Sequence, residues 1–121
     1  MAANKNLHVH ALDVKTAFLN AKIDHEIYVK QPEGFEVTRE GKPLYCKLKR
    51  ALYGLKQSGR MWNQNIHSFL VSNNFKQSSV DHCIYTKHDG VNFIMILLWV
   101  DDILIASSSE VLLTKLKELL K

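Results

Sequence analysis

The sequence predicts an α+β domain in which a mainly antiparallel sheet is covered by two helices. Three observations predict it: short apolar segments bounded by turn residues, two later segments with apolar residues at helical spacing, and a globular composition. The 121 residues are 46% hydrophobic and 23% charged, with a formal net charge of +4. These values exclude a disordered chain, a collagen and a coiled coil, and the length suffices for one buried core.

The first predicted strand covers residues 7–14 and places Val9, Ala11 and Asp13 on one face, because side chains alternate along a strand. Residues 15–21 predict a turn or a short helical piece.

Two further short strands are predicted at residues 26–30 and 44–48, with a polar loop at 38–43 between them. The segment Gln31-Pro32-Glu33-Gly34 places proline and glycine as in a type I turn.

Ser58 is the expected N-cap of the first long helix, and Asn73-Asn74 mark its end. Ser109 is the expected N-cap of the second helix. Each helix carries one apolar stripe. The two stripes consist of Met61, Trp62, Ile66, Phe69 and Leu70, and of Leu112, Leu113, Leu116, Leu119 and Leu120.

Between the helices, residues 83–86 predict a strand and residues 88–90 a turn. The apolar run Phe93–Val100 predicts a strand buried on both faces and is too short to span a membrane. Asp101-Asp102 separates this run from Ile103–Ala106, which predicts a β-hairpin with carboxylates at its tip.

Cys46 and Cys83 lie far apart, and residues 1–6 lack the apolar region of a secretory signal. We therefore expect reduced thiols, a reducing compartment and no secretion. Both ends of the chain lie close to predicted elements, from which we expect a fragment of a longer protein.

Asp101 and Asp102 are the sharpest candidates for chemistry. Two like charges between apolar segments are costly unless a cation compensates, and carboxylates are suitable ligands for Mg²⁺. If the strand ending at Asp13 pairs beside the hairpin, three acids converge and can hold two metal ions for phosphoryl transfer. The alternatives are that Asp101-Asp102 only favours a turn and that Asp13 caps the following helical piece.

Residues 41–60 contain six basic residues and no acid, with Tyr45 and Tyr53 among them. Such a stretch can track phosphates while its aromatic rings stack on bases, or it is a solvated basic face. The basic residues are Lys42, Lys47, Lys49, Arg50, Lys56 and Arg60.

Five segments, in order and spanning most of the chain, resemble motifs of copia-type retrotransposon reverse transcriptases. They are the first palm motif at 10–20, the segment after it at 28–35, the second motif at 51–58 with Arg60 and Trp62, the signature Asp81–Tyr85, and Trp99–Asp102, similar to the YxDD motif. Trp99 replaces the usual tyrosine, which puts primer or template contacts in doubt and removes no metal ligand.

The resemblance implies the palm of a polymerase that extends a primer on an RNA or DNA template from deoxynucleoside triphosphates. Asp13, Asp101 and Asp102 would be its catalytic residues. Asp13 and Asp101 would bind two Mg²⁺ ions, with Asp102 beside them and the Val14 carbonyl as a further ligand.

The same resemblance implies that Phe18 packs under the incoming sugar and leaves no room for a 2′-hydroxyl, although a core aromatic is the alternative. Gly54 would let the backbone approach a nucleotide closely. The full set implied to bind nucleotide or template is Phe18, Tyr53, Gly54, Lys56, Gln57 and Arg60.

The resemblance makes residues 1–121 a truncated palm fragment, with the fingers incomplete and the thumb and RNase H domain supplied elsewhere in the Pol polyprotein. The fragment is then expected to be inactive alone, and its parent to act in cytoplasmic virus-like particles without a membrane.

Three alternatives remain. One is a non-enzymatic, nucleic-acid-binding relic or co-opted protein, and another is a protein-interaction module. The third is a zinc site, although the spacing of the candidate ligands does not match that of known zinc sites. Its candidate ligands are His8, His10, Cys46, His82 and Cys83.

Overall fold

The computed structural model describes residues 6–120, which form two compact units. We call the described residues up to Thr16, together with those from Ile66 onward, the sheet unit. Ala17–Asn65 form the other, which we call the ribbon unit. Helix α1 (Ser58–Ser72) runs across the boundary between them. No helix in the described part of the chain is long and apolar enough to cross a bilayer.

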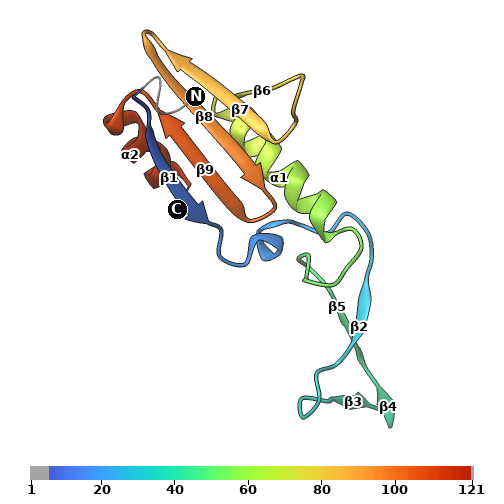
Figure 1. The fold of residues 1–121 in the computed structure, drawn as a ribbon. Helices are drawn as coiled ribbons and strands as arrows, with labels where there is room; N and C mark the ends of the chain where they lie inside the picture. The colour runs from blue at the N-terminus through green and yellow to red at the C-terminus, as the bar shows by residue number, and fades with distance from the viewer. Residues whose placement is uncertain (1–5, 121) are drawn as a thin grey trace. The chain divides into compact units, whose positions relative to one another are not determined.

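The sheet unit contains a five-stranded antiparallel sheet with the strand order β1-β9-β8-β7-β6 (Figure 1). The predicted strands and the hairpin tipped by acids are therefore confirmed, whereas the short strand β6 was not predicted. The strands are β1 (His8–Asp13), β6 (Lys76–Gln77), β7 (Ile84–Asp89), β8 (Asn92–Trp99) and β9 (Asp102–Ser107).

One face of this sheet forms the core. The side chains that fill it alternate along the two central strands: Ile94, Ile96, Leu98, Ile103 and Ile105. On the opposite face Leu97 is 38% exposed and Trp99 is 70% exposed, so the expected burial of β8 on both faces is wrong. A sheet built from hairpins needs cover on one side only, unlike a parallel sheet with crossover helices on both.

Both helices cover the same face. Sheet register places His10, Ile105, Ile96 and Tyr85 in one row across four strands, so their side chains share a face. On this face Nζ of Lys117 in α2 (Glu110–Leu119) lies 2.8 Å from Nδ1 of His10. The α+β class with two helices on an antiparallel sheet is confirmed.

Helix α1 reaches this face through His67 and the fully buried Tyr85. The Tyr85 hydroxyl accepts a hydrogen bond from Nε2 of Gln77 and pairs with Nδ1 of His67, both at 3.0 Å. Burial, followed by the charge of Cys83, raises the pKa of this hydroxyl, which keeps it neutral. The network satisfies a polar atom that would otherwise be costly inside the core.

The N-terminus of α1 differs from the expectation. The Gln57 carbonyl accepts the first helical bond, from the Met61 N–H at 3.0 Å, so Gln57 rather than Ser58 stands at the N-cap. The Ser58 hydroxyl donates instead to the Leu52 carbonyl at 2.5 Å. The predicted cap failed because the turn before the helix offers this buried hydroxyl another acceptor.

The C-terminus of α1 lies where it was predicted. Asn74 adopts a positive φ of 65°, and its N–H donates to the Val71 carbonyl. The next N–H, of Phe75, donates to the Leu70 carbonyl, which completes a Schellman motif. In α2 the predicted N-cap is confirmed, since the Ser109 side chain accepts from the Leu112 N–H.

The ribbon unit contains the short helix η2 (Ala17–Asn20) and two antiparallel strand pairs. The longer pair joins β2 (Tyr28–Lys30) to β5 (Tyr45–Lys47). Both strands were predicted, whereas their pairing was not. The expected polar loop instead holds a small hairpin of β3 (Thr38–Arg39) and β4 (Lys42–Pro43).

The backbone angles at two turns explain why the small hairpin forms and why the turn near Pro32 differs from the predicted one. Glu40 and Gly41 both have positive φ, 53° and 74°, which matches the two-residue turns that close tight hairpins. The Phe35 N–H donates to the Pro32 carbonyl, and Gly34 has a φ of 83°. The turn therefore begins at Pro32, one residue later than predicted, and its positive φ excludes type I.

Candidate active site

Side chains from three neighbouring strands share one row on the exposed face of the sheet. In the register of β1, β9 and β8, Asp13 lies opposite Asp102, and Asp102 lies opposite Trp99. Directly opposed residues project to the same face with Cβ atoms about 5 Å apart. We call Asp13 and Asp102, with the neighbouring Asp101, the acidic row.

The turn that carries Asp101 has an unusual backbone. Val100 and Asp101 connect the paired Trp99 and Asp102, and Val100 has a φ of 55°. Positive φ is rare for a β-branched residue and costs roughly 1–3 kcal/mol. The Asp101 carbonyl accepts a hydrogen bond from the Val14 N–H at 2.9 Å, which ties the end of β1 to the hairpin tip.

The acidic row is exposed to solvent. Asp13, Asp101 and Asp102 are all exposed, although the apolar segments beside Asp101 and Asp102 are buried on one face. The apolar neighbours of Asp101-Asp102 alternate between the helix-covered face, where Leu98 and Ile103 are buried, and the opposite face, where Trp99 is exposed. Water solvates these carboxylates, and burial alone does not require a cation.

The acidic row offers the type of donor atom that Mg²⁺ prefers. Carboxylate and carbonyl oxygens are its preferred ligands, and Mg²⁺ is commonly held by one or two carboxylates completed by substrate phosphates and water. Within residues 6–120, no group of three or more His, Cys, Asp or Glu could by itself hold a metal ion. The acidic row is thus not a closed cage.

The same finding overturns the zinc alternative. His8 and His10 lie on the helix-covered face of β1, where His10 pairs with Lys117. Cys46 is a half-buried residue of the ribbon unit.

In the ribbon unit, the second motif forms a tight turn before α1. The Leu55 N–H donates to the Leu52 carbonyl at 3.4 Å, and Gly54 has a φ of 92°. Glycine is the residue a turn of this kind requires at its third position. A Cβ at Gly54 would meet nothing within 4 Å, so the backbone angle demands glycine and steric crowding does not.

This turn presents Tyr53 against Phe18. Their ring centroids lie 5.7 Å apart at 35°, with Tyr53 92% exposed and Phe18 half-buried. The structure therefore brings two of the predicted nucleotide-binding residues into contact. Lys56 is exposed and Gln57 half-buried at the start of α1. The roles of these residues stay predictions.

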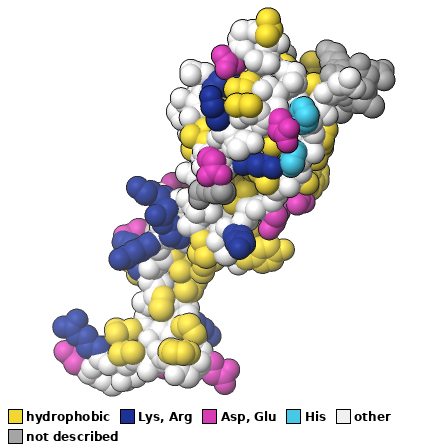
Figure 2. All heavy atoms as spheres, turned by 90° about the vertical axis from the view of Figure 1, so that its left-hand side faces the viewer, with side chains coloured by type: hydrophobic (Ala, Val, Ile, Leu, Met, Phe, Trp, Pro, Cys, Tyr) yellow, Lys and Arg dark blue, Asp and Glu magenta, His cyan; other side chains and the backbone are white. Residues whose placement is uncertain are grey.

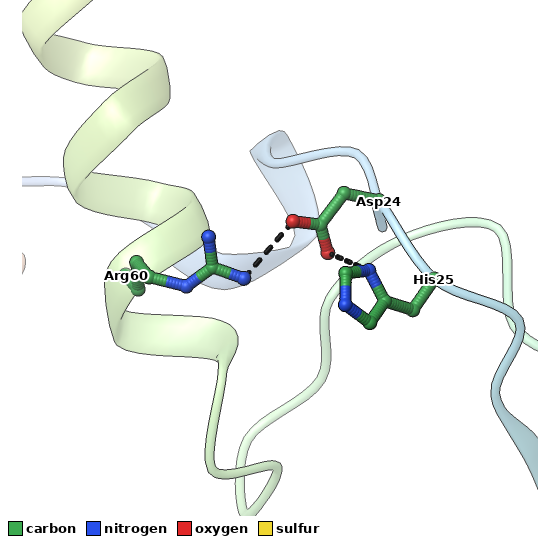
Figure 3. Close-up of polar contacts among 3 residues, drawn as sticks. All are labelled: Asp24, His25 and Arg60. Carbon is green, nitrogen blue, oxygen red and sulfur yellow. Dashed lines mark hydrogen bonds and ion pairs between the residues drawn. The ribbon is translucent and has the colours of Figure 1, made fainter.

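The basic stretch is partly neutralised by acids from another part of the sequence. Nη2 of Arg60 donates to Oδ2 of Asp24 at 2.9 Å, and Oδ1 of Asp24 lies 3.0 Å from Nδ1 of His25 (Figure 3). Lys47 forms an ion pair with Glu26. Nothing in the residue pattern around 24–26 marks these acids as partners, and sequence reasoning missed them.

Titration of both acids reflects these contacts. Desolvation opposes ionisation of Asp24, but the Arg60 hydrogen bond and the charges of His25 and Arg60 outweigh it and lower the pKa of the carboxyl. The hydrogen bond from Lys47 lowers the pKa of Glu26, and the same bond raises the pKa of Lys47.

Comparison with known proteins covers the whole chain. Residues 1–121 match the family model described as "Reverse transcriptase (RNA-dependent DNA polymerase)". The chain is 47% identical over 118 residues to the retrovirus-related Pol polyprotein from transposon TNT 1-94 of Nicotiana tabacum, covering 97% of this chain and 9% of that protein.

Two further relatives agree. The retrovirus-related Pol polyprotein from transposon RE2 of Arabidopsis thaliana is 35% identical over 113 residues, which are 93% of this chain and 8% of the relative. The transposon Ty1-BL Gag-Pol polyprotein of Saccharomyces cerevisiae is 31% identical over an alignment of 126 residues, which covers 97% of this chain and 6% of the relative. The chain thus spans less than a tenth of each of these relatives.

Proposed function

This chain belongs to the reverse transcriptase (RNA-dependent DNA polymerase) family, and we propose that it is the catalytic palm region of an RNA-directed DNA polymerase. The predicted resemblance to copia-type enzymes is confirmed by the family match and by the transposon Pol polyproteins among its relatives. We further propose that the rest of the polymerase, including the thumb and RNase H domain, is supplied by the same polyprotein, which acts in cytoplasmic virus-like particles.

The observation that carries the proposal is the acidic row. Sheet pairing sets Asp13 opposite Asp102, and the Val14–Asp101 hydrogen bond holds the hairpin tip against β1. A sheet positions such groups more precisely than a loop does. Asp13 and Asp102 belong to paired strands, and Asp101 in the adjoining turn is held by its carbonyl hydrogen bond. The exposed face leaves room for a primer and a triphosphate to reach them.

In this proposal Asp13 and Asp101 hold two Mg²⁺ ions, with Asp102 beside them and the Val14 carbonyl as a further ligand. The bound ions would supply the Lewis-acid stabilisation of an in-line phosphoryl transfer from a deoxynucleoside triphosphate to a primer 3′-hydroxyl. The chain contributes the positions of the oxygens and keeps them accessible to substrate.

The ribbon unit contributes substrate selection in this proposal. The Phe18 ring packs under the sugar and excludes a 2′-hydroxyl, and Tyr53 holds that ring in place through their contact. Gly54, Lys56 and Gln57 contact the nucleotide or the template. Arg60 also belongs to this set, and its Asp24 pair fixes the orientation of its guanidinium.

Primer extension tests the catalytic assignment, with this chain completed by the flanking polymerase segments of a Pol polyprotein. Asp101→Asn is expected to reduce extension by about a thousandfold or more, the scale of removing a central electrostatic group. Asp89→Asn is the matched control, because Asp89 is an exposed carboxylate at the other end of the β7–β8 hairpin. Wild-type extension by Asp101→Asn would overturn the assignment.

A second candidate function is nucleic-acid binding without catalysis, which the exposed Lys42, Lys49 and Lys56 favour. Its signature is salt-dependent binding of an RNA–DNA hybrid together with no magnesium-dependent extension by the completed polymerase. Binding that does not respond to salt would exclude it.

A further inference from the structure

The segments that carry Phe18 and Tyr53 are joined by backbone hydrogen bonds inside the ribbon unit. The Ala21 N–H donates to the Phe18 carbonyl at the end of η2, and the Ala51 N–H donates to the Ala21 carbonyl, both at 3.0 Å. Ala21 and Ala51 are almost fully buried. The position of η2 against the second motif therefore depends first on a backbone bond between two small residues.

A second point of attachment joins the same two segments through side chains. Asp24 lies six residues after Phe18 in one segment, and Arg60 lies seven residues after the tyrosine in the other. The Arg60 side chain extends from the first turn of α1 to one oxygen of the Asp24 carboxylate, and Nδ1 of His25 lies 3.0 Å from the other oxygen (Figure 3). Partners on both oxygens fix the orientation of this carboxylate.

The start of α1 connects this ion pair to the turn that presents Tyr53. The Ser58 hydroxyl donates to the Leu52 carbonyl, and the Ser58 N–H donates to the Leu55 carbonyl at 3.2 Å. Ser58 is 1% exposed, so both bonds are shielded from water. The first turn of α1, which carries Arg60, is thus bonded to both ends of the Tyr53 turn. A displacement of this helix end is therefore transmitted to the Tyr53 ring.

The Asp24–Arg60 pair is the solvent-exposed one of these attachments. Figure 2 shows both acidic and basic side chains at the surface of the lower part of the molecule, where Figure 1 places β2 to β5. The side chains of Asp24 and Arg60 are 40% and 53% exposed. An exposed ion pair adds little to overall stability, so its removal leaves the fold intact.

Without this pair the two segments remain joined on one side only. The Ala21–Ala51 bond stays, and beside it Nη1 of Arg50 donates to the Asn20 carbonyl at 3.4 Å. On the second-motif side both bonds precede the Tyr53 turn in the chain, whereas the ion pair follows it. Attachment before the turn alone lets the turn rotate, and attachment on both sides of it fixes its angle.

We propose that Asp24 is a positioning residue for sugar selection, which acts through Arg60 and the first turn of α1 to hold Tyr53 against the Phe18 ring. This inference rests on the proposed function, in which that ring excludes a 2′-hydroxyl. Asp24 itself does not touch the nucleotide. A contact of Arg60 with nucleotide or template would serve both kinds of sugar alike, whereas a displaced Phe18 ring admits the ribonucleotide selectively.

Primer extension by the completed polymerase tests the inference as the ratio of kcat/KM for a deoxynucleoside triphosphate to kcat/KM for its ribonucleotide. Asp24→Asn is expected to lower this ratio about two- to fivefold, the change in population that an exposed ion pair produces. Asp24→Glu keeps the charge and is expected to restore part of the ratio. Glu33→Gln is the matched control, because Glu33 is an exposed carboxylate of the same unit in the turn after Pro32. An unchanged ratio in Asp24→Asn, or an equal fall of both efficiencies, would overturn the inference.

Double-mutant cycles test whether the effect passes through the two rings. In a Phe18→Ala background the ring is absent, so Asp24→Asn is expected to leave the ratio where Phe18→Ala has set it. Tyr53→Leu gives a second background that does not disturb the core, because Tyr53 is 92% exposed. A further fall of the ratio on adding Asp24→Asn to either background would contradict the inference.

Amide hydrogen exchange of the same polymerase, without nucleotide or metal, separates this inference from the proposed function. Asp24→Asn is expected to speed exchange in residues 17–24 and 51–58, and Glu33→Gln is not, because only the first change loosens the two segments. Exchange that is the same in Asp24→Asn and wild type would refute the positioning role while primers are still extended. Conversely, extension that survives Asp101→Asn would refute the catalytic assignment and leave the exchange result intact.

Discussion

The positive φ of Val100 leads to a stability prediction for the tip of the acidic hairpin. Replacing Val100 by glycine removes the clash of a Cβ in the left-handed region, which costs about 1–2 kcal/mol for an L-residue. Glycine also destabilises the folded state by about 0.5–1 kcal/mol relative to alanine, because the unfolded chain then has more conformational freedom to lose. Alanine keeps the Cβ and hence the clash. We therefore expect Val100→Gly to be more stable than Val100→Ala by about 1 kcal/mol.

Urea unfolding followed by far-ultraviolet circular dichroism measures this difference, provided that the dependence on urea is the same in both variants. In primer extension by the completed polymerase the order should be reversed, and the glycine variant should be slower than the alanine variant. Glycine loosens the turn that carries Asp101, and a displacement of about 1 Å at a reacting group can cost a hundredfold in rate. An alanine variant as stable as the glycine variant would refute the argument from backbone strain.

Three other changes test the structure around the two candidate sites. Tyr85→Phe should lower the free energy of unfolding by about 1–3 kcal/mol in urea titrations, because both hydrogen-bond partners of the buried hydroxyl lose it. Gly54→Ala should destabilise by about 1 kcal/mol, whereas Gly59→Ala in the first turn of α1, where φ is not positive, should stabilise by about 0.5–1 kcal/mol. The pKa of Asp24 is below its ordinary value of 3.8, so its pair with Arg60 is present above that value and is lost as pH falls through the folded-state pKa. Asp24→Asn should therefore lose less stability than wild type between about pH 6 and pH 3.

Much of the fold could be predicted because its signals are local. The alternation of side chains along β1, the acidic break between two apolar runs, and Ser109 before the leucine stripe each depend on a few neighbouring residues. The hairpin tip and the cap of α2 were therefore placed correctly.

The misplaced features depend on what surrounds them. The apolar run of β8 was expected to be buried on both faces, because hydrophobicity alone does not tell whether one or two layers cover a strand. Ser58 was expected to cap α1, but its hydroxyl donates a hydrogen bond to the Leu52 carbonyl in the folded turn. In both cases a local preference was overridden by a partner that only the fold supplies.

For the candidate site too, the features that were predicted depend on local sequence. The residue types alone indicated hard oxygen ligands at Asp13, Asp101 and Asp102 and an aromatic at Phe18, and the order of the motifs indicated the family. The catalytic and binding roles stay predictions.

By itself the sequence determined the strand alternation, the turn chemistry and the kinds of donor atoms available. Only the tertiary structure decided that Asp13 lies opposite Asp102 and that Asp24 and Glu26 neutralise Arg60 and Lys47. The physical reason is that pairing between distant segments is set by the register and packing of whole strands, and not by the residues next to each partner in the chain.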